Sequence, residues 1–326
     1  MDRRTFLSTL AGGLVAAPLA TGAQQVARPT IGILDLGSAA SRRPVWAAFR
    51  EGLRERGYFE GENIAIEYRS ANEHTDRLPA LAAELLAMKV TVIVATGTTT
   101  IQAAKDATKT TPIVIAAGAD PVEMGFAQSL ARPGGNITGL SILGSDMIQK
   151  RLELLRQAVP QAKTAAFLLQ GANPGNPVFV RAITNAAPAL GLRIHVVQVR
   201  NVSELDGAFT GMVRAKADAL MVIEDPVFVT NAKRIADLAL HHRFPTILGN
   251  RLYVTAGGLM AYGLVSEDLW RRAAFFVDRI LKGAKPADMP IEQPTKFELV
   301  INMKTAKTIG LTISPSLLQR ADHVIE

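Results

Sequence analysis

Short apolar runs and amphipathic helical segments alternate along most of this chain. In the first part, runs rich in Ile, Val and Leu occupy residues 31–34, 64–68, 90–95 and 113–117. The segments between them, at 44–56, 75–88 and 98–108, have the period of about 3.6 residues that is typical of helices. Strands that are apolar on both faces need cover on both faces, which indicates βαβ units around a parallel sheet. Because βαβ crossovers are right-handed, the units predict an open, doubly wound sheet.

The same alternation resumes after a cluster of turn-forming residues at 131–139. Further apolar runs lie at 165–169, 194–199, 219–223 and 246–248, and helical segments lie near 178–190, 202–214 and 230–242. Four strands, an interruption and four more strands predict an α/β protein with two doubly wound parallel-sheet lobes.

The last part of the chain indicates an exchange between these lobes. An apolar run framed by glycines at 257–263 precedes an amphipathic helix at 267–281, which Ser266 is expected to cap and Gly283 to end. An extended stretch at 297–302 and a short final helix follow, which are too few elements for a third domain. We therefore expect lobe 1 to comprise residues 28–140 and 261–295, and lobe 2 residues 141–260 and 296–326. Three crossovers between the lobes would form a hinge around a cleft.

The N-terminus has the layout of an export signal. Arg3 and Arg4 precede an uncharged stretch, residues 5–23, that ends in small residues. A frayed amphipathic N-terminus would carry acidic residues, and this stretch has none. Paired arginines followed by Phe-Leu favour the twin-arginine route. We expect residues 1–23 to be a signal peptide that is cleaved near Ala23, which would leave a periplasmic protein.

Composition and motifs exclude several classes of function. The chain has no cysteine, so disulfide scaffolds, thiolate metal sites and thiol nucleophiles are excluded. The formal charge is +7, but Lys and Arg are scattered and aromatic residues are sparse, which indicates a solvated surface rather than a nucleic-acid interface. His241 and His242 are adjacent and would point in different directions on a helix, so they do not form a metal pair. Neither a nucleophile elbow nor a Walker lysine loop is present.

Several motifs resemble one known family. The most specific is the Pro-Gly-Gly-Asn-Ile-Thr-Gly turn at 133–139, and the others lie at 95–98, 120–122, 302–306 and 310–311. Together they are similar to the extracytoplasmic solute-binding proteins of the ABC transporter substrate-binding family, of the tryptophan- and tyrosine-binding kind. The resemblance covers essentially the whole mature chain. It implies the type I periplasmic-binding-protein fold, a small-molecule ligand and an ABC permease as partner. We expect the protein to be a monomer, to bind no cofactor and not to be an enzyme.

The chain departs from this family after its first strand. Relatives of the tryptophan-binding kind tend to carry a His-Pro pair in that loop, where this chain has Ser41-Arg42-Arg43-Pro44. The change leaves the fold and the role intact, but the identity of the ligand is not carried over from those relatives. Arg42 and Arg43 could select a ligand with a second acidic group.

One candidate ligand site lies where a strand ends at 95 and a helix opens at 98. Ligands of open parallel sheets bind beyond the carboxyl ends of the strands, where helix N-termini offer unpaired N–H groups. Gly97 permits close approach, and Thr98 and Thr99 can donate hydrogen bonds. The helix dipole favours an anion, so a ligand carboxylate would suit this position. N-capping by Thr98 is the structural role expected at the same place.

A second candidate site consists of two adjacent acids after the strand at 219–223. Glu224 or Asp225 could pair with a ligand ammonium group, because a charge removed from water must be paired. The structural alternative has Asp225 capping the next helix and Glu224 paired with an arginine. A zwitterion such as an amino acid would then bridge the two lobes.

Five further residues are weaker candidates for ligand contact. Each lies near the end of a predicted strand or in a suspected crossover: Ser38, Asp120, Asn176, Asn250 and Tyr262. Helix capping is the structural alternative for Asp120 and Asn176, and packing against the hinge is the alternative for Tyr262. The leading hypothesis is a protein that delivers a small solute, an amino acid or small carboxylate, to an ABC importer. The alternatives are an exported α/β enzyme such as a hydrolase, and a ligand-binding partner of a membrane sensor.

Overall fold

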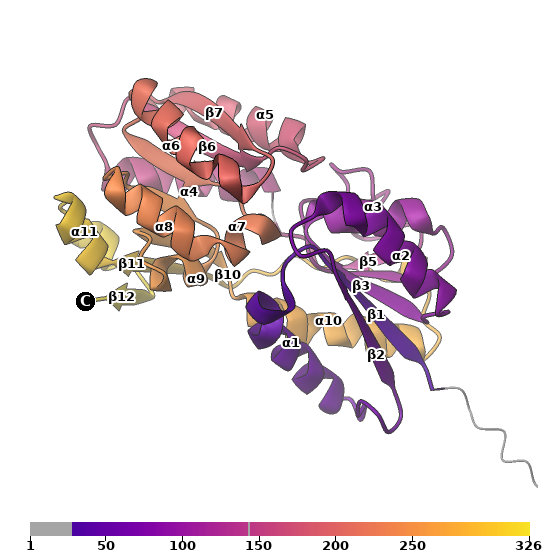
Figure 1. Ribbon diagram of the computed structural model, residues 1–326. Helices are drawn as coiled ribbons and strands as arrows, with labels where there is room; N and C mark the ends of the chain where they lie inside the picture. The colour runs from indigo at the N-terminus through magenta and orange to yellow at the C-terminus, as the bar shows by residue number, and fades with distance from the viewer. Residues whose placement is uncertain (1–27, 143) are drawn as a thin grey trace, which may run out of the picture.

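The computed structural model describes residues 28–142 and 144–326, which form two α/β lobes (Figure 1). The residues expected to be a signal peptide lie outside the described part of the chain. Within the described part, no helix has both the length and the apolar character needed to cross a membrane. The predicted fold class, two mostly parallel sheets in two lobes, is confirmed.

Lobe 1 is built on a five-stranded parallel sheet in the order β2-β1-β3-β4-β5. Its strands are β1 (Thr30–Asp35), β2 (Ala65–Ser70), β3 (Val92–Thr96), β4 (Ile113–Ala117) and β5 (Ile137–Gly139). Its helices are α1 (Ala39–Arg54), η1 (Thr75–Arg77), α2 (Leu78–Ala87), α3 (Thr98–Ala107), α10 (Ser266–Leu281) and η4 (Pro286–Asp288). Helices α1 and α10 cover one face of the sheet, and α2 and α3 cover the other. The central strands are apolar on both sides for this reason.

Lobe 2 is built on a seven-stranded sheet in the order β12-β11-β10-β9-β8-β6-β7, in which only β10 and β11 pair antiparallel. Its strands are β6 (Thr164–Gln170), β7 (Arg193–Val199), β8 (Ala219–Val222), β9 (Thr246–Leu248), β10 (Met260–Leu264), β11 (Phe297–Asn302) and β12 (His323–Ile325). Its helices are α4 (Gly144–Ala158), α5 (Asn176–Ala186), η2 (Pro188–Leu190), η3 (Val202–Glu204), α6 (Leu205–Arg214), α7 (Pro226–Thr230), α8 (Ala232–His241), α9 (Arg251–Thr255), α11 (Met303–Ile309) and α12 (Pro315–Leu318). Helices α6 and α8 lie on the near face of this sheet in Figure 1.

Two segments differ from the sequence-based expectation. Strand β5 lies inside the stretch 131–139 that composition marked as turn, because Ile137 to Gly139 pair with β4. Residues 261–264 were expected in lobe 1, but they belong to β10 and lie in the sheet of lobe 2 between β9 and β11. Local sequence could not show this, because β10 is defined by partners that lie elsewhere in the chain.

Helix α10 joins lobe 1 through a continuous apolar stripe. The stripe consists of Leu269, Ala273, Phe276 and Ile280, all of which are buried, as expected for core packing. The helix lies along α1, where the rings of Phe49 and Trp270 meet edge to face with centroids 5.9 Å apart. Helix α10 therefore belongs to lobe 1, although it follows strands β6–β10 of lobe 2 in the sequence.

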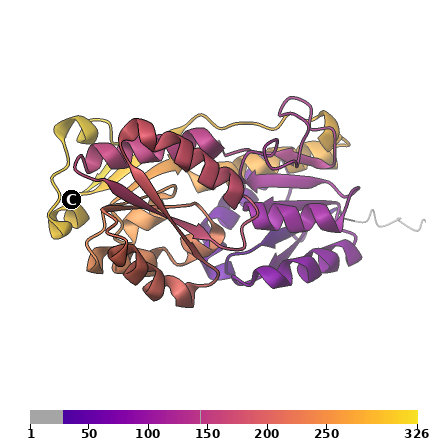
Figure 2. The ribbon, with the colours of Figure 1, turned by 90° about the horizontal axis from the view of Figure 1, so that it is seen from above.

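The chain crosses between the lobes three times: between β5 and α4, between β10 and α10, and between η4 and β11. The last of these runs along one side of the molecule from one lobe to the other (Figure 2). The first and third crossings are hydrogen-bonded to each other. The Ser141 N–H donates to the Glu292 carbonyl, and the Glu292 N–H donates to the Gly139 carbonyl, both at 2.9 Å. The Glu292 carboxylate also accepts two hydrogen bonds from Arg272 of α10, at 2.6 and 2.8 Å. The crossings therefore form a connected hinge.

Strands β9 and β10 approach each other closely just before the second crossing. A Cβ at Gly263 would lie 1.9 Å from the Gly249 carbonyl oxygen, which belongs to the backbone and cannot rotate away. By contrast, a Cβ at Gly211 in helix α6 would meet no atom within 4 Å.

We predict that Gly263→Ala destabilises the protein by about 1–3 kcal/mol through overpacking. The matched variant Gly211→Ala should stabilise it by up to about 1 kcal/mol, because alanine is the better helix former. Thermal unfolding of both variants beside the wild type tests this. Equal melting temperatures for the two variants would contradict the close approach.

Candidate functional site

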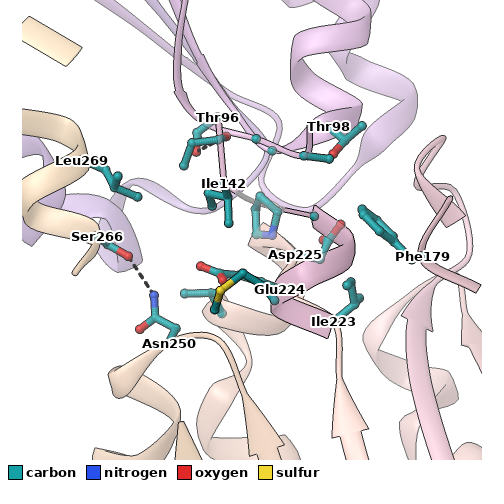
Figure 3. A pocket seen from close by; sticks show the side chains of 18 of the residues that line it. Thr96, Thr98, Ile142, Phe179, Ile223, Glu224, Asp225, Asn250, Ser266 and Leu269 are labelled. Carbon is teal, nitrogen blue, oxygen red and sulfur yellow. Dashed lines mark hydrogen bonds between the residues drawn. The ribbon is translucent and has the colours of Figure 1, made fainter. Parts of the chain in front are cut away.

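A cleft lies between the lobes at the carboxyl ends of both sheets (Figure 3). It encloses a volume of about 770 Å³, including the part that is open to solvent. Lobe 1 contributes the ends of β3 and β4 and the start of α10, and lobe 2 contributes the ends of β8 and β9 and the start of α4. Of the ten residues predicted to contact ligand, five line the cleft: Gly97, Thr98, Glu224, Asp225 and Asn250.

The start of helix α3 forms the lobe 1 wall. Gly97, not Thr98, is the N-cap residue, so the expected capping role of Thr98 is wrong. Gly97 has φ +81°, which a residue with a side chain rarely adopts, and no side chain caps the helix. The first-turn N–H groups consequently remain available to an anion. Thr99 lies outside the lining, and its buried hydroxyl has no partner among the described residues.

Asp225 faces Thr98 from lobe 2 but is largely engaged by its own lobe (Figure 3). It is the N-cap of α7, and its Oδ1 accepts from the Val227 N–H at 3.0 Å. Its Oδ2 accepts from the Asn173 amide at 2.9 Å. Burial raises the pKa of Asp225, while the hydrogen bonds from Val227 and Asn173 act in the opposite direction. Asp225 therefore has the helix-capping role that the sequence offered as the alternative to ligand contact.

Glu224 forms a buried ion pair with Arg151 of α4, at 3.2 Å between Oε2 and Nη2. The Arg151 Nε also donates to the Tyr262 carbonyl at 2.8 Å. A Cβ at Gly249 would lie only 2.1 Å from the Arg151 guanidinium, so this glycine leaves the space for the pair. Burial raises the pKa of Glu224, and the neighbouring Arg151 opposes that shift. The Glu224 side chain keeps 21% exposure, which leaves a carboxylate oxygen open to the cleft.

Arg151 was not identified from the sequence. A local signal did exist, because this charged residue lies on the same face of α4 as the buried Ile148, Leu152 and Leu155. A charge on an apolar helix face must find a partner, but only the fold shows that the partner is Glu224, 73 residues away.

A second arginine reaches the cleft from α1. Arg42 is buried and pairs through Nε with Asp35 at the end of β1, at 3.0 Å. Burial raises the pKa of Asp35, and Arg42 opposes that shift. Arg43, the next residue of α1, is exposed.

Asn250 connects the lobes beside the hinge. Its Oδ1 caps α9 by accepting from the Leu252 N–H at 2.9 Å, and its Nδ2 donates to the Ser266 hydroxyl at 2.9 Å. Ser266 is the first residue of α10 in lobe 1, so this side-chain bond spans the cleft wall (Figure 3).

The rest of the lining is mainly apolar. The side chains are Ile142, Met147, Ile148, Phe179, Ile223, Pro226, Val229, Leu269 and Trp270. In the sequence they are indistinguishable from core residues, because they occupy apolar stripes and strand ends. Their arrangement can cover an aliphatic or aromatic skeleton.

Two further predicted residues lie outside the lining and bond to their own segments of the backbone. Ser38 is the N-cap of α1 and accepts from the Ser41 N–H at 3.3 Å. Asp120 accepts from the Val122 N–H at 2.8 Å and closes a turn rather than opening a helix.

The last two predicted residues also lie outside the lining. The Asn176 amide donates to the Gln170 carbonyl at 2.9 Å, within lobe 2. The ring of Tyr262 stacks on Phe297, with centroids 5.8 Å apart. The backbone carbonyl of Tyr262, and not its ring, takes part in the site, because it accepts a hydrogen bond from Arg151.

The lobes touch each other at the mouth of the cleft. The Asn231 amide of lobe 2 donates to the Glu73 carboxylate of lobe 1 at 2.7 Å, and the Ser41 and Thr230 hydroxyls are 3.2 Å apart. Glu73 has φ +70°, so a strained backbone presents its carboxylate to the other lobe. These contacts define a closed arrangement of the lobes.

We predict that Glu73→Ala shifts the ligand-free protein towards an open form. The variant loses one hydrogen bond between the lobes, which contributes about 1 kcal/mol to closure. Small-angle X-ray scattering should show a larger radius of gyration than in the wild type. Glu62→Ala, an exposed glutamate of the same lobe, is the control. Identical scattering from all three proteins would contradict the role of Glu73.

Comparison with known proteins finds a matching family and a relative that spans nearly the whole chain. Residues 30–325 match the family model described as ABC transporter substrate binding protein. The tyrosine-binding protein of Clostridioides difficile (strain R20291) is 27% identical over 323 residues, covering 94% of this chain and 93% of that protein.

Two solved structures of similar sequence identity match the structure of this chain to different degrees. The ABC domain from Streptococcus pneumoniae in complex with L-Trp has a TM-score of 0.84 at 27% identity, covering 91% of this chain and all of that one. A ligand-free, open substrate binding protein from Clostridium difficile has a TM-score of 0.64 at 26% identity, covering 91% of this chain and 99% of that one. At equal coverage and nearly equal identity, the ligand-bound relative is the better match, in agreement with the closed arrangement. The fold is that of the type I periplasmic binding proteins. This chain belongs to the ABC transporter substrate-binding protein family, whose members are extracytoplasmic solute-binding proteins and not enzymes.

Proposed function

We propose that this protein binds an amino acid between its lobes and, as a monomer, delivers it to an ABC importer. One observation carries the proposal: the uncapped amino end of α3 and the cleft-facing carboxylate of Glu224 lie on opposite lobes of one cleft. These two groups are complementary to the carboxylate and the ammonium of a zwitterion.

The paired charges of the cleft suit the carboxylate and ammonium of an amino acid main chain. Arg42 is paired with Asp35 and Arg151 with Glu224, so each cation already has an anion. Asp225 is compensated by the amino end of α7, which it caps. A zwitterion adds one charge of each sign and leaves this balance unchanged.

The apolar wall and the relatives support an amino acid with a large side chain. Phe179, Ile142 and Trp270 offer ring and aliphatic surface that an aromatic side chain can cover. One relative is a tyrosine-binding protein, and another was solved in complex with L-Trp. We therefore propose tyrosine and tryptophan as the first ligands to test.

Closure would make the bound state recognisable to the permease. A ligand that contacts both lobes binds the closed form better than the open one and so shifts the population towards closure. The contacts at the cleft mouth would then hold the form that the importer meets.

We predict that calorimetry with the mature protein detects binding of L-tyrosine or L-tryptophan. Glu224→Gln should weaken that binding about tenfold or more, since a hydrogen bond to a charged group contributes about 1.5–3 kcal/mol. The matched ligand 3-(4-hydroxyphenyl)propionate lacks the ammonium group, so its affinity should hardly change in this variant. Equal loss for both ligands would assign Glu224 to the structure of the lobe instead. The absence of binding to either amino acid would count against the proposed ligand class.

We further propose that residues 1–23 direct twin-arginine export, with cleavage near Ala23 and a periplasmic mature protein. The support is the Arg3-Arg4 pair before a modestly apolar, uncharged stretch. Replacing both arginines by lysine should leave uncleaved precursor in the cytoplasm in a fractionation experiment. Arg28→Lys, beyond the proposed cleavage position, is the control and should be exported normally. Normal export of the double variant would argue against this route.

A further inference from the structure

Arg42 presents donor groups to the cleft that no protein atom uses. Its side chain is 11% exposed and lines the cleft, and its Nε is paired with Asp35. Within residues 28–142 and 144–326, no atom accepts a hydrogen bond from either of its terminal amino groups. A ligand that closes the cleft would take water away from these amino groups, so it must supply their acceptors or lose affinity.

Asp35 holds the guanidinium in place from behind. This carboxylate is fully buried at the end of β1 and also accepts from the Gly37 N–H at 2.8 Å. A Cβ at Gly37 would lie 2.9 Å from the Arg42 Nε, so the glycine leaves space for the side chain. Arg42 is thus positioned before any ligand arrives, and little side-chain entropy remains to be lost on binding.

The other two arginines nearby differ from Arg42 in their hydrogen bonds or in their exposure. Arg151 also lines the cleft, but its side chain is only 4% exposed, and its Nε and Nη2 donate to the Tyr262 carbonyl and to Glu224. Arg43 is exposed on the outer side of α1. The helix explains the difference, because Arg42 lies on the buried stripe with Val45 and Phe49, and the next residue is turned by about 100°.

A carboxylate is the acceptor that matches two parallel guanidinium N–H groups. The proposed function already assigns the ligand's main carboxylate to the start of α3, which follows a different strand from Arg42. The ammonium faces Glu224 on the other lobe. Arg42 therefore remains for a further acidic group, carried on the skeleton that the apolar wall covers.

We propose that Arg42 makes the cleft selective for amino acids with a second carboxylate in the side chain. The proposal rests on the proposed function and refines its ligand class. It follows that a side-chain carboxylate should bind better than a carboxamide of the same shape, because the amide offers one neutral acceptor where the carboxylate offers two charged ones.

Calorimetry with two isosteric pairs tests this selectivity. The pairs are L-glutamate with L-glutamine, and 4-carboxy-L-phenylalanine with 4-carbamoyl-L-phenylalanine, and L-tyrosine and L-tryptophan are measured beside them. In the wild type, the carboxylate member of at least one pair should bind at least about tenfold more tightly than its amide, which corresponds to 1.4 kcal/mol.

Arg42→Gln should remove this preference, to within about twofold, and leave the affinity for the amide nearly unchanged. Arg43→Gln removes the same charge from the exposed neighbour and should keep the preference. Arg42→Gln leaves Asp35 without its partner, so its melting temperature is measured first. If it does not fold, Asp35→Asn/Arg42→Gln replaces it, because that double variant leaves no unpaired charge at this position.

The outcomes separate this proposal from the proposed function. Wild-type binding of tyrosine or tryptophan without preference for either carboxylate member would overturn the role of Arg42 and leave the proposed function standing. An equal loss for every ligand in Arg42→Gln would also overturn it, since Arg42 would then hold the main carboxylate. No binding of any of the six compounds to the wild type would overturn both.

Discussion

The buried pair of Arg151 and Glu224 connects the parts of lobe 2 on which the cleft depends. Arg151 lies on α4, the first helix after one hinge crossing, and its Nε donates to the carbonyl of Tyr262, just before another crossing. Its Nη2 meets Glu224 at the end of β8. The pair requires the space left by Gly249, whose carbonyl in turn packs against Gly263. A cleft carboxylate and two hinge segments are thereby held in one arrangement, because a charge buried in this place needs its partner.

The hinge and the cleft are parts of the same architecture. Parallel strands carry all their carboxyl ends to one edge, so each lobe offers one row of loops and helix starts. Three crossings bring the two rows face to face, and the first and third crossings are bonded through the backbone of Glu292. Neither lobe alone surrounds a ligand. The polar groups that suit a zwitterion are divided between them, so we expect binding and closure to support each other.

Much of the fold was predictable from the sequence, whereas the site was predictable only in part. All eight strands predicted from apolar runs are present, and six of them are buried along nearly their whole length, which imposes a pattern on consecutive residues. The edge strands β2 and β7 are only partly buried. Strand β10 was assigned to the wrong lobe, since its pairing with β11 depends on residues about 40 positions away. The helix start at Thr98 and the acids at Glu224 and Asp225 were found because they follow predicted strands. Arg151 and the apolar wall were missed, because their roles appear only when distant segments meet.

The sequence by itself determined the two α/β lobes, the family and the edge of each sheet on which a ligand site must lie. These properties follow from periodicity and from short motifs, which are local. Only the tertiary structure decided that Arg42 rather than Arg43 enters the cleft, that Asp225 is occupied as a cap, and that Glu224 keeps an oxygen towards the ligand space. Burial and hydrogen-bond partners distinguish such residues, and both are properties of contacts between segments that are far apart in the chain.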